Sequence, residues 1–451
     1  MPRTTQIFCA STLYGAATLA AAIESDCFPE ADRRLLLVCN NAATPEITPA
    51  VDEMPGFEPL REHFDGVLSW NEAISPFHPG AWSPRPDDFP LFERHLRLLW
   101  DLGDDRVALV MESLQVNPAL AIAQSFAEAP IDVYADGLMS YGPTRNKIDP
   151  LVGTRVRRLL HLDLVPGLTP LLLTEFDVPA QAVATDAFMK VLSRIGDAVP
   201  RLPPLPEHAA VLLGQYLSAL DILSVEEEED LHVRMLRGAV ARGHRSVVFK
   251  PHPTAPARYS RALETEAERL GADLTVLDLP VLAEVLFEKA RPALVVGCFS
   301  TALFTASAFH GLPVARVGTG LLLDRLTPYQ NSNRVPVVLA DALLPDLAEL
   351  PDLADGKEDG QGEAALSPDL LTGLVTTVGF VMQPQIHPGL RPAAERFLSQ
   401  HFGPRIQRYF KRRRLTSLGL PGGIPERLAF LPRSATARRV VRRARALKKK
   451  L

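Results

Sequence analysis

Short apolar runs alternate with segments of helical periodicity along most of the chain. The runs are rich in leucine and valine, and they are continuous instead of alternating with polar residues. The predicted strands, in chain order, are Gln6–Ala10, Arg34–Cys39, Gly66–Trp70, Arg106–Met111, Ile131–Tyr134, Leu159–Leu162, Ala209–Leu213, Ser246–Phe249, Asp273–Leu277, Ala293–Val296 and Val314–Val317. Segments such as Leu91–Leu102 and Pro118–Ala127 lie between them and carry apolar positions at helical spacing. Continuous apolar strands, each followed by a helix, predict parallel sheets covered on both faces.

A proline-rich segment interrupts this alternation near the middle of the chain. Residues 199–207 contain four prolines, a composition typical of a stiff, extended linker. We therefore predict an α/β fold of two facing Rossmann-like domains, residues 1–198 and 208–400, followed by a basic helical tail at 401–451. In doubly wound sheets, ligands bind beyond the carboxyl ends of the strands. The predicted site is a cleft between the domains.

Composition is that of a soluble globular protein, with 47% hydrophobic and 22% charged residues among 451. The four cysteines show no spacing typical of a zinc site or a disulfide framework, which favours a reducing compartment. The apolar stretch Leu13–Ile23 is interrupted by Tyr14-Gly15 and closed by Glu24, so a strand, a turn and a helix explain it better than a signal peptide. No window approaches about 20 apolar residues, the length that spans a membrane. The sequence predicts a cytoplasmic protein.

Charge is distributed unevenly along the chain. Residues 401–451 hold 16 of the 48 Lys+Arg residues and one of the 53 Asp+Glu residues, so the rest of the chain is acidic. Basic clusters separated by apolar residues are typical of a segment that lies on an anionic membrane surface, where each cation contributes about 1 kcal/mol. We predict that the tail Lys411–Leu451 docks there, with a polyanionic glycan as the alternative partner. Aromatic interleaving typical of nucleic-acid binding is missing, so no nucleic acid is expected.

A lysine and a stiffly held histidine follow one strand of the second domain. The run Ser246–Phe249 leads to Lys250 and then to His252, which is flanked by Pro251 and Pro253. Prolines on both sides restrict the backbone and keep the histidine out of a helix or a ladder. The pairs His78-Pro79 and His387-Pro388 lack a preceding strand and lysine, so the dipeptide alone predicts nothing.

A second polar turn follows the strand Ala293–Val296. Gly297 is followed by Ser300 and Thr301, which open the helical segment Ala302–His310. Backbone N–H groups at a helix N-terminus, together with hydroxyl side chains, suit a phosphate. Ser300 could instead only cap the helix. Its expected position beside Lys250 and His252 in one sheet favours the phosphate site.

Acidic residues follow two strands of the first domain. Asp136 lies on a turn with Gly137 after the strand Ile131–Tyr134, and Glu112 follows Arg106–Met111. An acid on one wall of a cleft and an imidazole on the other suit a transfer reaction with a general base and a general acid. An Asp-Gly pair alone is most often just a turn.

Taken together, these segments resemble a known enzyme family. In order and spacing, they resemble the acidic-acidic-Gly, His-Pro and Ser-Ser/Thr motifs of bacterial sialyltransferases, which have the glycosyltransferase B fold. With Phe8–Gly15, the layout is most similar to the α-2,8-polysialyltransferase-like group, over about residues 5–340. The segments that carry the resemblance are Tyr134, Asp136-Gly137, Lys250–Pro253, Gly297 and Ser300-Thr301.

The resemblance implies an inverting, metal-independent glycosyltransferase. It would move sialic acid, or a related nonulosonic acid, from a CMP-sugar to a glycan hydroxyl, with no cofactor besides this co-substrate. Asp136 would be the catalytic base and His252 would act on the departing phosphate. Residues on the donor side would be Lys250, Pro253, Glu284, Gly297, Ser300 and Thr301, with Glu284 on the ribose. Possible additional site residues are Glu112, Tyr134, Gly137 and Gln215.

One residue departs from the family pattern and keeps other functions open. Ala135 occupies the first acidic position of the motif, so the base could be Asp136 or Glu112, or could be absent. A catalytically silent protein that binds CMP or an anionic glycan is the alternative of another class. A cytidine-nucleotide-dependent glycerophosphotransferase of the teichoic-acid type is the closest alternative enzyme. Acceptor loops are expected at Asn71–Pro90 and after Gly137.

Overall fold

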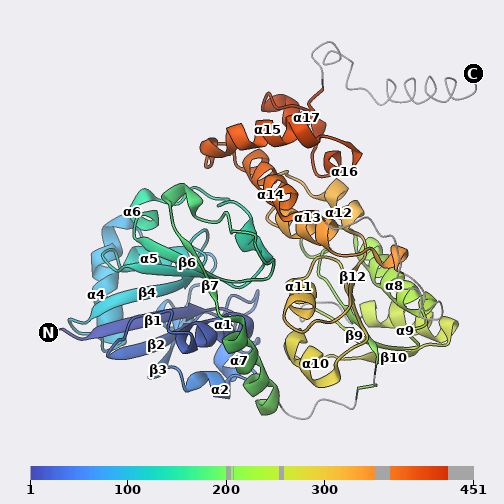
Figure 1. Ribbon diagram of the computed structural model, residues 1–451. Coiled ribbons are helices and arrows are strands. Elements are labelled where there is room, and N and C mark those ends of the chain that lie inside the picture. The colour runs from blue at the N-terminus through green and yellow to red at the C-terminus, as the bar shows by residue number, and fades with distance from the viewer. Residues whose placement is uncertain (1, 200–204, 207, 253–257, 351–365, 425–451) are drawn as a thin grey trace, which may run out of the picture.

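The computed structural model describes residues 2–199, 205–206, 208–252, 258–350 and 366–424. It contains two parallel sheets, with strand orders β3-β2-β1-β4-β5-β6-β7 and β10-β9-β8-β11-β12 (Figure 1). The strands of the first sheet are β1 Thr4–Ala10, β2 Arg33–Val38, β3 Gly66–Ser69, β4 Arg106–Glu112, β5 Ile131–Ala135, β6 Val156–Leu162 and β7 Ala180–Val183. Those of the second sheet are β8 Ala210–Leu213, β9 Ser246–Lys250, β10 Asp273–Val276, β11 Leu294–Gly297 and β12 Val314–Arg316. The predicted fold of two Rossmann-like α/β domains is confirmed.

The sequence prediction missed one strand and shortened another. Strand β7 has exposed side chains at three of its four positions, so it lacks the apolar run that announced the other strands. Strand β6 begins at Val156, before the predicted start at Leu159. The prediction started too late because Arg157 and Arg158 interrupt the apolar pattern. Both arginines are held by the buried carboxylate of Asp132 on β5, at 2.6 and 3.2 Å. Paired cations can therefore extend a strand that the apolar pattern alone ends early.

Helices cover both faces of each sheet. In the first domain α1 and α7 pack on one face, against Phe8 and Ala10, and α4 and α5 pack on the other, against Ile7 and Cys9. In the second domain α8 and α9 lie on one side of the sheet and α10 and α11 on the other (Figure 1). The helices are α1 Leu13–Glu24, α2 Glu58–Arg61, α3 Trp70–Ala73, α4 Phe89–Leu99, α5 Ala119–Ser125, α6 Pro150–Gly153, α7 Thr185–Ala198, α8 Val225–Ala241, α9 Arg258–Leu270, α10 Ala283–Ala290, α11 Thr301–Ala308, α12 Thr319–Arg325, α13 Arg334–Leu343, α14 Pro368–Met382, α15 Arg391–His401, α16 Pro404–Gln407 and α17 Arg412–Ser417. Within the described residues, no helix is both long and apolar enough to cross a membrane.

The two domains contact each other directly through α7 and α10. Gly196 of α7 packs against the Lys289 side chain of α10, whose ammonium contacts the Asp197 carboxylate at 2.5 Å. The proline-rich linker predicted at 199–207 lies largely outside the described residues, which include 199, 205 and 206 of it. The domain interface therefore includes packed helices as well as the connecting chain.

The last helices return from the second domain to the first. Gly379 of α14 packs against Leu171 and Pro143, and the Gln383 side chain donates to the Arg145 carbonyl at 2.8 Å. The C-terminal helices thereby contact loops of the first domain.

Part of the predicted basic tail is folded. Residues 401–424 include α16 and α17, and their apolar side chains Ile406, Tyr409 and Leu415 are buried. These apolar positions, spaced between the cations, give the helices one face that packs on the protein. The remaining tail, residues 425–451, lies outside the described residues.

Candidate active site

The end of β5 in the first domain lies beside the start of α11 in the second domain. A Cβ atom added to Gly137, in the turn after β5, would lie 3.2 Å from the Thr301 hydroxyl at the first residue of α11. That distance is tighter than ordinary van der Waals contact, so Gly137 permits the approach. The Asp-Gly turn of one domain and the Ser-Thr turn of the other are therefore neighbours between the two domains.

Asp136 lies at this junction, beside the first turn of α1. Its Oδ2 atom is 3.4 Å from the position that a Cβ atom on Gly15 would take. Burial raises the pKa of Asp136 to about 7, and the charges of Glu112 and Glu284 act in the same direction. A carboxyl with that pKa exists in both protonation states near neutrality, which suits a general base.

Glu112 ends β4 and shares this environment. Its carboxylate accepts a hydrogen bond from the Ser11 hydroxyl, and burial raises its pKa. Ala135 packs against the apolar cluster on the other face of the sheet, while its neighbour Tyr134 packs with α1. Because successive strand residues point to opposite faces, Asp136 shares a face with Glu112 and residue 135 does not.

Tyr134 has a structural part in this arrangement. Its side chain is fully buried, and its hydroxyl donates to the Cys9 carbonyl at 2.9 Å. The same hydroxyl lies 2.9 Å from the position of a Cβ atom on Gly15, so it also limits the side chain at that residue. Tyr134 therefore ties β5 to β1 beneath Asp136.

Lys250 and His252 follow β9, as the sequence predicts. Lys250 is buried, and its ammonium donates to the Leu279 carbonyl at 3.4 Å. Burial lowers the pKa of Lys250, although the charges of Glu284 and Asp278 oppose that shift. The cation therefore lies in a site of low polarity, where its attraction for an anion is strong.

The His252 ring packs against Tyr216 in a tilted arrangement, with ring centroids 4.0 Å apart and an interplanar angle of 34°. Burial and the neighbouring Lys250 lower the pKa of His252 to about 4. The ring is therefore neutral at pH 7, whereas its ordinary pKa would leave both states accessible. A phosphate dianion beside the ring would favour protonation and raise the pKa again. Pro253, predicted on the donor side, lies outside the described residues.

The loop after β8 holds His252 from below. A Cβ atom on Gly214 would lie 3.0 Å from Pro251 Cα and 3.1 Å from the His252 nitrogen, both backbone atoms. The next residue, Gln215, is buried, and its backbone N–H donates to His232 Nε2 at 3.2 Å. The close contact between this loop and the backbone of Pro251 and His252 therefore restricts the position of the imidazole relative to the sheet.

Replacing Gly214 with alanine should displace the backbone at Pro251 and His252. We expect transfer to fall about tenfold or more, because small displacements of a reacting group are costly, while the melting temperature changes little. The measurement is kcat/KM for the transfer proposed below, together with thermal unfolding. Gly389→Ala is the matched control, since its Cβ atom would meet nothing within 4 Å. Equal activity of both variants would contradict the expectation.

Glu284 lies between the two halves of the site. It is buried in α10, and its carboxylate accepts a hydrogen bond from the Thr305 hydroxyl of α11 at 2.8 Å. Burial raises the pKa of Glu284, while Lys250 lowers it. Because its charge also acts on Asp136, Glu284 connects the electrostatics of both domains.

Ser300 caps α11, with its hydroxyl accepting from the Ala302 N–H at 3.2 Å. Gly297 ends β11, where a Cβ atom would lie 3.2 Å from the Leu303 side chain. Ser300 therefore caps α11, as one of its two expected roles requires, and Thr301 lies beside Gly137. Gly297 allows α11 to lie closely over its strand.

Tyr14 belongs to the site, although it was not among the site residues predicted from the sequence. Its hydroxyl is buried and has no hydrogen-bond partner among the described residues. Burial, followed by the charges of Glu284 and Asp136, raises the pKa of Tyr14 well above its ordinary value. The available signal was its position in the first turn after β1, at the same sheet edge as Asp136.

Among the described residues, no group of three or more His, Cys, Asp or Glu side chains could hold a metal ion.

Comparison with known proteins identifies the family of this chain. A search of curated protein sequences found no match. Among solved structures, MurG of Acinetobacter baumannii is similar, with 12% identity, coverage of 89% of this chain and 95% of that chain, and a TM-score of 0.40.

Two sialyltransferase structures are also similar. The glycosyltransferase B domain of a Photobacterium damselae sialyltransferase has 12% identity, covers 75% of this chain and 96% of that chain, and has a TM-score of 0.39. A Photobacterium sp. JT-ISH-224 2,6-sialyltransferase, in a ternary complex with CMP and lactose, has 12% identity, coverages of 78% and 80%, and a TM-score of 0.38. The profile of the alpha-2,8-polysialyltransferase family matches residues 6–319, well over half of the sequence. The chain belongs to the alpha-2,8-polysialyltransferase family.

Proposed function

We propose that the protein is an inverting glycosyltransferase that moves sialic acid, or a related nonulosonic acid, from a CMP-sugar to a glycan hydroxyl. The observation that carries this proposal is a carboxyl with a pKa of about 7 beside a helix N-terminus, across the contact between Gly137 and Thr301. Membership of the polysialyltransferase family supports it. The reaction needs a base for the acceptor and a cationic site for the phosphate, and the two domains supply one each.

In this proposal the acceptor hydroxyl attacks the anomeric carbon of the donor sugar. A new carbon–oxygen bond forms there while the bond to the CMP phosphate breaks, and Asp136 takes the acceptor proton. Lys250, His252 and the N–H groups opening α11 stabilise the charge on the departing CMP. Glu284 would orient the ribose of CMP. Since CMP leaves as a stabilised phosphate, the proposed transfer is metal-independent and uses no cofactor beyond its donor.

A donor screen tests the proposal directly. The full chain is incubated with CMP-sialic acid or CDP-glycerol and a set of glycan acceptors, and nucleotide release is measured. We expect CMP to be released from CMP-sialic acid at a rate that increases with the concentration of the acceptor. Turnover of CDP-glycerol alone would contradict the proposal and favour a glycerophosphotransferase, whereas CMP binding without release would favour a silent binding protein.

We further propose that the basic C-terminal region, Lys411–Leu451, docks on an anionic membrane surface, as a peripheral cytoplasmic enzyme of cell-surface polysaccharide synthesis would. Lys411, Arg412 and Arg413 line one surface cavity of about 530 Å³ together with Arg408 and with Asp324, the ion-pair partner of Lys411, and this excess of cations supports the proposal. Vesicles with and without anionic lipid are sedimented with the full chain and with a chain ending at residue 424. Equal sedimentation of both chains with anionic vesicles would contradict a role for the tail beyond that residue.

A further inference from the structure

The first turn of α1 places a tyrosine ring at the junction of the two domains. Gly15, the next residue, lies against the turn after β5, where Asp136 Oδ2 is 3.4 Å from the position that a Cβ atom on Gly15 would take. The Tyr14 ring packs edge-on against Phe188 of α7, with centroids 5.3 Å apart. Phe188 in turn packs edge-on against Phe309, which follows α11 in the second domain, at 6.0 Å. Contacts from both domains therefore hold the Tyr14 ring beside Asp136.

The hydroxyl group of Tyr14 differs from those of other buried tyrosines. It is buried, and no described residue forms a hydrogen bond with it. The hydroxyls of Tyr134 and Tyr329 are also buried, and they donate to backbone carbonyls at 2.9 and 3.0 Å. A buried hydroxyl without a partner costs free energy, and native folds seldom retain one. The Tyr14 hydroxyl is therefore a group whose partner a bound ligand would supply.

This hydroxyl is a neutral hydrogen-bond donor among acids. Burial, followed by the charges of Glu284 and Asp136, raises the pKa of Tyr14 well above its ordinary value, so the phenol stays protonated at pH 7. Neither carboxylate forms a hydrogen bond with it. A protonated phenol can donate to an anionic oxygen without adding a charge of its own. The partner that suits this hydroxyl is thus an anionic acceptor between the two domains.

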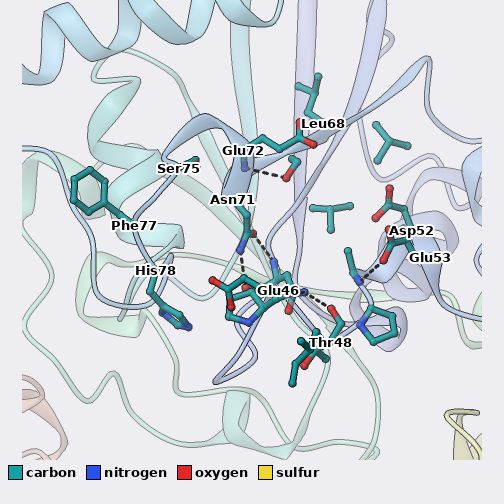
Figure 2. Close-up of a pocket in the computed structure, with 18 of the residues that line it drawn as sticks. Glu46, Thr48, Asp52, Glu53, Leu68, Asn71, Glu72, Ser75, Phe77 and His78 are labelled. Atoms are coloured by element: carbon teal, nitrogen blue, oxygen red, sulfur yellow. Dashed lines mark hydrogen bonds between the residues drawn. The ribbon is translucent and has the colours of Figure 1, made fainter.

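The cavity beside the ends of β2 and β3 does not supply that partner. It has a volume of about 910 Å³ and is lined by residues from Val38 to His78, as Figure 2 shows. Its lining includes neither Tyr14 nor Asp136. Strands β1 and β4 also lie between β2 and β5 in the sheet. The partner is therefore expected on a substrate bound between the domains.

The proposed donor has two anionic groups that can accept this hydrogen bond. One is the phosphate, for which the second domain provides Lys250, His252 and the N–H groups that open α11. The other is the carboxylate that the anomeric carbon of a nonulosonic acid carries. Tyr14 belongs to the first domain and lies beside the proposed base, and the anomeric carbon has to lie near that base when the acceptor attacks. The carboxylate is attached to that carbon, so it is the better acceptor for Tyr14.

We propose that Tyr14 donates a hydrogen bond to the carboxylate of the donor sugar, and thereby favours donors whose anomeric carbon bears a carboxylate. The inference rests on the proposed function, because the carboxylate belongs to the donor class named there. The O–H bond of Tyr14 stays intact, and the hydrogen bond holds the carboxylate while the bond to CMP breaks. A lysine in this place would pair with Asp136 and Glu284 and lower the pKa of both acids. A phenol binds the carboxylate and leaves the base near neutrality.

A Tyr14→Phe variant of the full chain removes the hydroxyl and keeps the ring. Calorimetric titration without acceptor compares two ligands, CMP and a CMP-sialic acid analogue that is fluorinated next to the anomeric carbon and resists transfer. We expect affinity for the analogue to fall about 10- to 100-fold, as for a lost hydrogen bond to a charged group, while affinity for CMP stays the same. Urea unfolding without ligand should show a variant that is as stable as the wild type or more stable, because no hydrogen bond is lost.

Tyr329→Phe is the matched control, because it removes a buried hydroxyl that has a partner in the second domain. It should lower stability and leave both affinities unchanged. Equal affinity of wild type and Tyr14→Phe for the analogue, a parallel loss for CMP, or a Tyr14→Phe variant less stable than wild type overturns the inference. If the wild type neither binds the analogue nor turns over CMP-sialic acid, the proposed function fails and the inference falls with it. If the wild type turns over CMP-sialic acid and Tyr14→Phe binds the analogue normally, only the inference fails.

Discussion

Replacing Asp136 with asparagine should abolish most of the transfer activity while making the protein more stable above neutral pH. Loss of a general base lowers a rate by about 10²- to 10⁴-fold, and the asparagine amide keeps the shape of the carboxyl group. The measurement is acceptor-dependent CMP release at saturating donor. Asp163→Asn is the control, because Asp163 follows the neighbouring strand β6 and lies outside the proposed machinery.

The pH dependence of the wild-type activity gives a second test of Asp136 as the general base. Only the carboxylate can accept a proton, so activity should rise with pH through about 7, the pKa to which burial raises this group. If the Asp136→Asn variant keeps the wild-type rate and pH profile, Asp136 is not the general base. Glu112 would then be the candidate base, and a Glu112→Gln variant would test it.

The stability effect has the opposite sign to the effect on activity. Because the folded-state pKa of Asp136 is raised from 3.8 to about 7, the folded protein favours the protonated acid, and stability falls as pH rises through that interval. Each pKa unit corresponds to about 1.4 kcal/mol, so a shift of about three units predicts that the asparagine variant gains on the order of 4 kcal/mol at pH 8. It should gain almost nothing at pH 4. Urea unfolding at both pH values measures the difference, and a destabilised variant at pH 8 would contradict this account of burial.

Replacing Lys250 with methionine should weaken binding of CMP much more than binding of cytidine. Methionine has a similar length and is apolar, so the buried site stays filled while its cation is lost. A hydrogen bond to a charged group contributes about 1.5–3 kcal/mol, so CMP affinity should fall roughly 10- to 150-fold. Lys250 also lowers the pKa of Glu284, against the effect of burial. The pKa of Glu284 should therefore rise further in the variant that lacks this lysine.

Calorimetric titration with the two ligands separates phosphate binding from general damage. Cytidine lacks the phosphate and should bind both proteins with similar affinity. Lys190→Met, an exposed lysine on α7 that pairs with Asp186, is the matched control. Parallel loss of CMP and cytidine affinity would mean that Lys250 supports the fold of the site and does not bind phosphate.

The resemblance to sialyltransferases and the local chemistry of the strand ends agree on most of the site. Strand ends are readable because a buried parallel strand needs a continuous apolar run, and the first polar residue after it lies at the sheet edge. Lys250, Asp136 and Glu112 could therefore be located from the sequence. Tyr134 was predicted from its place in a motif, but its buried hydroxyl connects β5 to Cys9 of β1, across β4.

The sequence could not predict the properties that arise from proximity across the cleft. The pKa of Asp136 depends on burial and on Glu284 from the other domain, and neither is a local property of the residues around position 136. Tyr14 was missed for the same reason, since its hydroxyl matters only once Asp136 and Glu284 are near it. The cavity beside the ends of β2 and β3 combines segments around Asn40, Asp52 and Asn71 that no motif links.

By itself, then, the sequence determined the two parallel sheets, the order of the chemical groups along their edges and the family. It could do so because strand burial and helix periodicity are encoded locally, residue by residue. Only the tertiary structure decided that His252 is neutral, that Asp136 titrates near neutrality and that the Tyr14 hydroxyl is buried without a hydrogen-bond partner among the described residues. Those properties are sums over charges and buried surfaces brought together from distant parts of the chain, so they exist only after folding.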